Sequence, residues 1–244
     1  MCEQCRTTRR AVSRRSVMTG AGALLAASAL PFSQARAEQK VPTGAPNPNA
    51  IPPSEALDRL MQGNARYAAN QPNERDFSAA RAALAEAQFP IAAVVSCSDS
   101  RVVPDLVFDQ SPGSLFVVRL AGNIVDDDAF ASLEYAVKFL GAPLILVLGH
   151  SNCGAVAAAI KVVMERAELP GHLPELIKAI EPAVIAAHGR HPGDLLAVAI
   201  EENVRLGIRQ LINDAPVISE ALTAKTIAIS GGVYNIATGK VSLI

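Results

Sequence analysis

The stretch that decides the fold spans residues 144–156 and reads LILVLGHSNCGAV. Its first five residues are continuously apolar, which is typical of a strand buried on both faces of a parallel sheet. His150 and Cys153 follow directly, and an Ala-rich apolar segment at residues 155–167 then predicts a helix. Because α/β sheets bind ligands at the carboxyl ends of their strands, His150 and Cys153 are candidate ligand-binding residues.

Strand and helix signals alternate on both sides of this stretch. Apolar runs predict strands at residues 91–96, 115–118, 226–230 and 233–236, with a turn at Thr238-Gly239 before a final strand at 240–244. Helical spacing predicts helices at residues 78–87, 126–140, 174–188 and 194–212, and an earlier helix with Ser54 as its N-cap. We therefore expect an α/β fold with a mostly parallel central β-sheet flanked by helices and an N-terminal helical arm.

Composition limits the classes of function. The chain has 244 residues, and 50% of them are hydrophobic, which is enough for one well-packed domain. The formal net charge is −1 and no basic stripe stands out, which argues against a nucleic-acid partner. No apolar run reaches the roughly 18 residues that a membrane-spanning helix needs.

The N-terminal residues resemble a targeting segment rather than part of the fold. Residues 13–18, SRRSVM, resemble the twin-arginine export signal, with Val17 and Met18 as mild departures. A weakly apolar stretch at residues 19–30 follows, and Ala35-Arg36-Ala37 offers a small-x-small cleavage site. The alternative interpretation is a basic tail.

This interpretation divides the chain into three parts. We expect an export signal at residues 1–37, a Pro-rich linker or arm at 38–52, and the domain at 53–244. The protein would use the twin-arginine export machinery, cross the membrane folded, and reach the periplasm or another extracytoplasmic space. Cys2 and Cys5 lie inside the signal, where incidental thiols are favoured over a metal or redox site.

A second group of candidate ligands lies in CSDSR at residues 97–101, after another predicted strand. Cys97, His150 and Cys153 offer two thiolates and an imidazole, a donor set that suits zinc and leaves one coordination position open. Each residue alone is better explained as a buried thiol or a loop histidine, whereas the three together favour metal binding. The two cysteines could instead form a disulfide. If a helix begins near Ser151, its dipole would favour the thiolate at Cys153.

Asp99 and Arg101 lie beside the first thiol. Asp99 is placed to accept a hydrogen bond from a zinc-bound hydroxide, and Arg101 could hold Asp99 off the metal through a bidentate pair. If Arg101 released the carboxylate, Asp99 could become the fourth ligand and close the site. The alternative is an ordinary salt bridge beside a loop.

Four motifs in combination resemble the beta-class carbonic anhydrases: CSDSRV, FVVR-x-x-G-N, LEYAV and GHSNCGAV, which begin at residues 97, 116, 133 and 149. The similarity extends from about Leu57 to Val241. It implies one Zn²⁺ per subunit on Cys97, His150 and Cys153, with Asp99 and Arg101 as the catalytic dyad. It also implies reversible hydration of CO2 to bicarbonate and a proton by a zinc-bound hydroxide, in a homodimer or homotetramer.

The resemblance adds three substrate-binding candidates. Gln88 matches a glutamine that plant-type members contribute from the neighbouring subunit, Gly154 offers its backbone amide, and Tyr135 matches a tyrosine near the active-site cleft. Without the resemblance, these residues are better explained as a surface loop residue, a turn residue and a core residue. His172, His188 and His191 are proton-shuttle candidates without any spacing argument.

Some positions depart from the family pattern. Family members often read Arg-Asn-x-Ala-Asn where residues 119–123 of this chain read Arg-Leu-Ala-Gly-Asn, and Ala155 replaces a common second glycine. Members regulated by bicarbonate carry Trp three residues before the first zinc cysteine, where this chain has Val94. This difference favours an open, water-bound site, although Arg119 and Tyr135, which that regulatory site would use, are present.

Three other functions remain open at this point. A regulatory homologue would hold zinc without turnover, but it would lack the dyad that Asp99 and Arg101 provide. An exported redox protein would use Cys97 and Cys153 as a disulfide. A zinc hydrolase could use the same metal site on carbon disulfide or a related heterocumulene.

Overall fold

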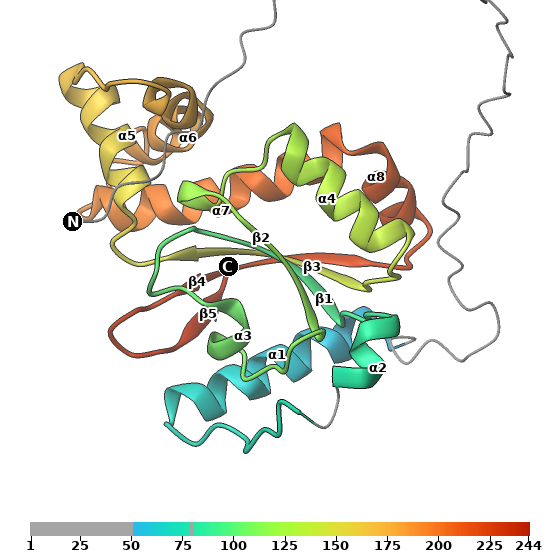
Figure 1. Cartoon of the computed structure of the whole chain (residues 1–244). Coiled ribbons are helices and arrows are strands. Elements are labelled where there is room, and N and C mark those ends of the chain that lie inside the picture. Colours follow the sequence, from blue (N-terminus) through green and yellow to red (C-terminus); the bar gives the residue numbers. More distant parts are fainter. Residues whose placement is uncertain (1–50, 79–80) are drawn as a thin grey trace, which may run out of the picture. The chain divides into compact units, whose positions relative to one another are not determined.

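The computed structural model describes residues 51–78 and 81–244, and a five-stranded sheet forms its centre (Figure 1). The strand order is β2-β1-β3-β4-β5, with bounds Leu115–Arg119, Ala92–Ser96, Leu144–His150, Ala228–Tyr234 and Val241–Leu243. The pairs β1–β2, β1–β3 and β3–β4 are parallel, and only β5 runs antiparallel to its neighbour. The mostly parallel sheet expected from the apolar runs is confirmed.

Helices cover both faces of the sheet (Figure 1). One apolar cluster joins Leu60 of α1 (Pro53–Ala68) and Val107 of α3 (Pro104–Val107) to alternate strand residues such as Leu146. The cluster on the other face joins intervening strand residues such as Val147 to α4 (Asp127–Lys138), α7 (Leu195–Asp214) and α8 (Pro216–Thr223). Burial on both faces explains why the central strands are continuously apolar.

A third apolar cluster lies beyond the carboxyl ends of β1 and β3. It contains residues of α5 (Gly154–Glu165), α6 (Leu173–His188) and the first turns of α7, and it includes Cys97 and Cys153. The two thiols are therefore packed against aliphatic side chains such as Ile180 and Val156 on one side.

The C-terminal strands differ from the prediction in one respect. The two strands expected at residues 226–230 and 233–236 are one strand, β4, which contains Gly231 and Gly232. A Cβ on Gly231 would lie 2.7 Å from Ile208 Cδ1, so this glycine allows α7 to approach the sheet rather than making a turn. The turn before β5 is confirmed, with Gly239 at φ 72°.

The helix boundaries also differ in places. α1 begins at Pro53 with Pro52 as its N-cap residue, so Ser54 lies in the first turn and does not cap the helix. α2 (Arg81–Glu86) is shorter than expected, and α3, α8 and the 3-10 helix η1 (Ala121–Asn123) were not predicted. Among the described residues, none of the helices combines the length and the hydropathy required to cross a membrane. The predicted export signal and all but the last two residues of the linker lie outside the described residues.

Candidate metal centre and active site

The sheet brings the two predicted ligand segments together. Cys97 follows β1 and His150 ends β3, and these strands are direct neighbours in which Ser96 pairs with Leu148. Cys153 lies three residues further on, at the N-cap of α5. One ligand atom from each of the three residues lies within 4.8 Å of the others, and all three side chains are buried.

One ring nitrogen of His150 makes a hydrogen bond, and the other has no hydrogen-bond partner among the described residues. Nδ1 lies 3.0 Å from the carbonyl oxygen of Ser151, and because a carbonyl can only accept, Nδ1 is the protonated nitrogen. Nε2 is buried and has no hydrogen-bond partner among the described residues. A buried, unpaired Nε2 beside two thiols is the arrangement of a metal-ligating histidine whose other nitrogen is fixed by a carbonyl.

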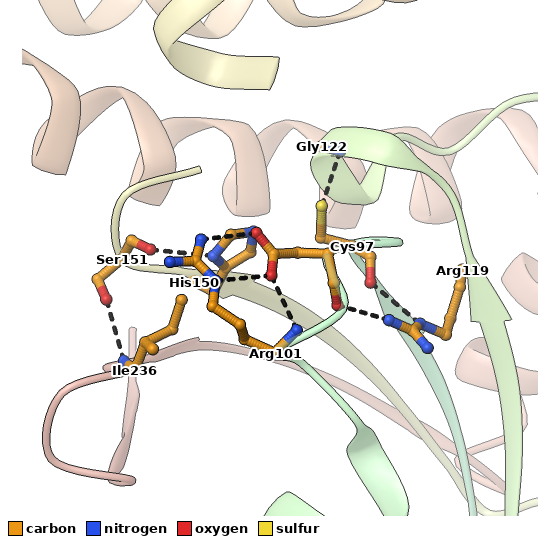
Figure 2. Close-up of polar contacts among 8 residues, drawn as sticks. Cys97, Arg101, Arg119, Gly122, His150, Ser151 and Ile236 are labelled. Atoms are coloured by element: carbon orange, nitrogen blue, oxygen red, sulfur yellow. Dashed lines mark hydrogen bonds and ion pairs between the residues drawn. The ribbon is translucent and has the colours of Figure 1, made fainter. Parts of the chain in front are cut away.

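The segment from His150 to Cys153 is a tight turn rather than the first turn of a helix. α5 begins at Gly154, so the expectation of a helix start near Ser151 is wrong. Asn152 adopts a left-handed conformation with φ 56°, which reverses the chain between strand and helix. The backbone N–H of Ser151 donates to the carbonyl of Tyr234 at 2.9 Å. The hydroxyl of Ser151 accepts from the N–H of Ile236 at 3.0 Å (Figure 2).

The segment after β1 is held from the neighbouring strand β2 and from η1. Arg119, at the end of β2, donates from Nε to the carbonyl of Cys97 and from Nη2 to the carbonyl of Asp99, at 3.1 and 2.7 Å (Figure 2). The backbone N–H of Gly122 donates to Sγ of Cys97 at 3.2 Å. The sequence interpretation assigned neither function to Arg119 or Gly122, although both belong to the FVVR-x-x-G-N motif.

Asp99 and Arg101 form the bidentate pair expected from their spacing. Arg101 Nε and Nη2 donate to the two carboxylate oxygens of Asp99 at 2.9 and 2.8 Å, and the Arg101 backbone N–H adds a third bond at 3.0 Å. These bonds hold the pKa of Asp99 well below its usual range, although partial burial acts in the opposite direction. Asp99 Oδ2 lies 4.0 Å from His150 Nε2, so an ionised carboxylate lies at the edge of the ligand group.

In the absence of a metal, the pKa values of the two thiols differ, and the negative charge is favoured on Cys97. The adjacent Cys153 thiol and the Gly122 N–H favour the Cys97 thiolate, and the pKa of Cys97 falls to about 4 despite burial. The same thiolate, together with burial, raises the pKa of Cys153. The N–H groups of Ala155 and Val156 lower the pKa of Cys153 but do not offset burial and the neighbouring Cys97. In the metal-free protein the thiolate is therefore favoured at Cys97 rather than at Cys153. A metal cation bound by Cys97 and Cys153 would displace the proton that remains on this pair of thiols, because metal-ligating thiols are deprotonated.

The three substrate-binding candidates occupy different places. Gly154 is exposed at the start of α5, and a Cβ added there would meet nothing within 4 Å. Gln88 is exposed in the segment after α2. Tyr135 lies on α4 against Phe116 and Phe139, with ring centroids 6.3 and 5.3 Å away. Phe116 pairs with Ala93, three residues before Ser96, so Tyr135 lies about 10 Å back from the ligand edge of the sheet.

The histidines considered as proton shuttles lie at the two ends of α6. His172 is the N-cap residue of this helix. His188 and His191 lie close together at its other end, with ring centroids 6.1 Å apart, and both are exposed. The metal-ligating group contains only His150 among the histidines of the described residues.

Comparison with known proteins identifies the family. The family model described as carbonic anhydrase matches residues 92–241, which include all three ligand residues and the dyad. The chain belongs to the carbonic anhydrase family. A carbonic anhydrase of Mycolicibacterium smegmatis is 38% identical over 200 residues, which cover 81% of this chain and 95% of that protein. Carbonic anhydrase 2 of Mycobacterium tuberculosis is 36% identical over the same length, covering 81% and 94%.

Solved structures place the chain in the beta class. The beta-carbonic anhydrase CcaA has a TM-score of 0.60 at 30% identity, covering 77% of this chain and 94% of that one. A structure from a study of two tetrameric beta-carbonic anhydrases of Sordaria macrospora has a TM-score of 0.62 at 25% identity, covering 78% and 97%. The protein is a beta-class carbonic anhydrase, a zinc enzyme that catalyses the reversible hydration of CO2 to bicarbonate and a proton. Two thiols and an imidazole with an unpaired nitrogen fit zinc.

Proposed function

We propose that Cys97, His150 and Cys153 hold the zinc ion of this carbonic anhydrase. The observation that carries the proposal is the buried, unpaired Nε2 of His150, which lies with two buried thiols in one group. An unpaired buried polar atom costs about 1–3 kcal/mol, and a metal ion at this position would remove that cost. Three protein ligands leave the fourth zinc position for a water molecule.

The dyad orients the reaction. Zinc, when bound here, supplies a water molecule that is acidic enough to lose a proton near neutral pH. Asp99 accepts a hydrogen bond from the reacting water and thereby directs its lone pair toward CO2. Arg101 occupies both carboxylate oxygens, which keeps Asp99 ionised and fixed in one orientation. This orientation supports the open form of the site, in which Asp99 is not a ligand.

Bicarbonate-controlled closure has little support in this chain. Val94, which stands where regulated members carry Trp, is fully buried in the apolar cluster under α1. Arg119 is engaged with the backbone carbonyls of Cys97 and Asp99. We therefore propose that the site stays open when bicarbonate binds, and that added bicarbonate inhibits only as product.

Substrate contacts come from two protomers in this proposal. The open space at Gly154 leaves its backbone amide accessible to CO2 beside Cys153. Gln88 and Tyr135 lie away from their own protomer's ligand group, so we propose that they complete the site of a neighbouring subunit. Tyr135→Phe and Gln88→Ala would then raise the KM for CO2, and mixing each variant with Asp99→Asn chains would restore active sites.

We propose that the protein is a homodimer or homotetramer. Tetramers are named for the relatives from Sordaria macrospora. Phe77 and Leu106 are 57% and 50% exposed in the single chain, which is a large exposure for apolar side chains. Light scattering after gel filtration measures the mass of the particle, and a monomer at micromolar concentration would contradict this proposal.

We propose that residues 1–37 direct export of the folded, zinc-loaded protein to the periplasm. The support is the SRRSVM segment with its following apolar stretch and cleavage site. Replacing Arg14 and Arg15 with Lys should keep the protein in the cytoplasm of a bacterial host. Equal periplasmic amounts of the double variant and the wild type would contradict the twin-arginine route.

Stopped-flow CO2 hydration by the full chain, with bound zinc quantified, tests the functional assignment. We expect one zinc per chain and fast hydration, and both should be lost in Cys153→Ser. Zinc with turnover of carbon disulfide but not of CO2 would favour the heterocumulene hydrolase. Zinc with neither activity would indicate a zinc-holding regulatory homologue, and a zinc-free Cys97–Cys153 disulfide would indicate a redox protein.

A further inference from the structure

Gly122 donates a backbone hydrogen bond to Cys97, the proposed zinc ligand, and it is held on several sides. Its N–H donates to Sγ of Cys97 at 3.2 Å (Figure 2), and its carbonyl accepts from Nδ2 of Asn203 at 2.7 Å. A Cβ at Gly122 would lie 2.6 Å from Ile180 Cδ1 and 3.1 Å from Ala155 Cβ. Its φ of 72° is one that side chains rarely adopt, so only glycine fits without strain.

Asn203 reaches Gly122 from a helix 81 positions away in the sequence. It lies in the middle of α7 and is only 4% exposed, between the apolar residues Ile200 and Val204. A buried amide in an apolar helix face is costly unless its polar atoms are satisfied. The carbonyl of Gly122 satisfies the Nδ2 donor, which ties α7 to the segment that contacts Cys97.

The two polar groups of Gly122 belong to adjacent peptide planes joined at its Cα. The torsions at this Cα set how the two planes lie relative to each other, and glycine allows them a wide range, so a bond to the next plane limits how the N–H can move rather than fixing it alone. Asn203 holds the next plane through its carbonyl, and the Asn123 N–H in that same plane donates to the carbonyl of Leu120 at 2.9 Å. Ile180 lies against Gly122 on the side of α6. The direction of the N–H toward Cys97 thus depends on a side chain that does not contact the thiol itself.

We infer that Asn203 is a positioning residue for the zinc ligand Cys97, acting through the backbone of Gly122. It serves as an outer hydrogen-bond partner, of the kind whose loss typically weakens metal binding about 10- to 100-fold. The inference rests on the proposed role of Cys97 as a zinc ligand. It assigns α7 a part in metal binding in addition to its part in the core.

The test measures the zinc dissociation constant of the full chain by chelator competition, in the wild type, Asn203→Ala and Asn203→Leu. We expect the constant to rise about 10- to 100-fold in both variants. Asn203→Leu removes the hydrogen bond without leaving a cavity. It therefore allows the zinc measurement on a folded protein if the cavity created by Asn203→Ala prevents folding. The cobalt-substituted variants should also show a shift in the near-ultraviolet thiolate-to-cobalt charge-transfer band, because a ligand has lost its oriented donor.

Leu211→Ala is the matched control. Leu211 is fully buried on the same helix, eight residues or about 12 Å further along, in the cluster that packs on the sheet. This variant should lose stability but keep the zinc constant within about twofold and the cobalt spectrum unchanged. Wild-type zinc affinity and spectrum in folded Asn203 variants would overturn the inference, as would equal weakening in Leu211→Ala. A wild-type chain that binds no zinc would instead overturn the ligand assignment.

Discussion

Two segments of the chain carry the proposed metal ligands, and they are held in different ways. The Cys97 loop (residues 97–101) is held by guanidinium groups, from Arg119 to its carbonyls and from Arg101 to Asp99. The His150 turn (residues 150–153) is held to the β4–β5 hairpin by the backbone N–H and the hydroxyl of Ser151, and its two proposed ligand residues are at most 1% exposed. In the Cys97 loop, the Asp99 side chain is 17% exposed and that of Arg101 is 53% exposed.

This difference separates two tasks. A turn whose ligand residues are buried suits ligands that must stay in place, because those residues have little contact with water. A loop fixed by charged side chains at the surface suits a group that must face both the metal and the solvent from which CO2 arrives. We therefore assign retention of the metal mainly to the His150 turn and orientation of the reaction to Asp99 in the Cys97 loop.

The largest expected effect follows from breaking the His150 turn. His150→Ala removes the imidazole ligand, so zinc should be lost on dialysis and CO2 hydration should fall to the uncatalysed rate. Metal analysis and stopped-flow assays on the same sample measure both. Lys178→Ala, which removes an exposed cationic side chain from α6, is the matched control and should retain zinc and activity.

The second prediction compares the thiols of the two segments in the metal-free protein. With a pKa of about 4, Cys97 should be a thiolate above that pH, whereas Cys153, whose pKa is raised, stays protonated through neutrality. Absorbance near 240 nm, taken as the difference between wild type and Cys97→Ser, should therefore rise by one thiolate as pH increases through about 4. A midpoint near the ordinary thiol value of 9.0 would contradict the unequal sharing of charge.

Asp99→Asn sharpens the comparison, because it changes the Cys97 loop without removing a ligand. The amide has the shape of the carboxylate but lacks its charge, so kcat/KM for CO2 should fall about 10²- to 10³-fold with one zinc still bound. Asp127→Asn, an exposed carboxylate in the first turn of α4, should keep wild-type kinetics.

Arg119→Met should have a smaller effect on the same loop. It removes the two bonds to the carbonyls of Cys97 and Asp99 while keeping an unbranched side chain. We expect a fall of about tenfold in kcat/KM, with zinc retained but released faster to chelator. Arg59→Met removes an exposed guanidinium that pairs with Glu55 within α1, and unchanged kinetics are expected there.

The smallest effect is expected at Ser151. Ser151→Ala removes the hydroxyl that accepts from the Ile236 N–H but leaves the backbone bond to Tyr234. The free energy of unfolding of the zinc-loaded protein should fall by about 1 kcal/mol in urea, with CO2 hydration nearly unchanged. Thr223→Ala, which removes an exposed hydroxyl bond within α8, gives the baseline for a lost surface hydroxyl.

Sequence reasoning predicted the sheet and the ligand group because both depend on strong local signals. Buried parallel strands give continuous apolar runs, and a parallel sheet places their carboxyl ends together, which brought Cys97 to His150. The single strand β4 was missed because Gly231 and Gly232 look like a turn until α7 is packed against them. The short helix α3 is too brief to show a period.

The supporting contacts were harder to predict. The bond from Asn203 to Gly122 joins residues 81 positions apart, and nothing local distinguishes this asparagine from a solvent-exposed one. Arg119 and Gly122 lie in a recognisable motif, but which atoms they contact depends on the η1 turn after β2. The preference for a thiolate at Cys97 depends on hydrogen-bond donors that only the folded chain brings to this thiol. The helix-dipole argument, which predicted a thiolate at Cys153, considered α5 alone.

The most direct test measures zinc content and CO2 hydration on the same preparations of His150→Ala and Asp99→Asn. The account predicts that His150→Ala loses both, whereas Asp99→Asn keeps one zinc per chain and loses most of its turnover. Loss of zinc in Asp99→Asn, or full turnover in either variant, would contradict the division between a segment that holds the metal and a segment that orients the reaction.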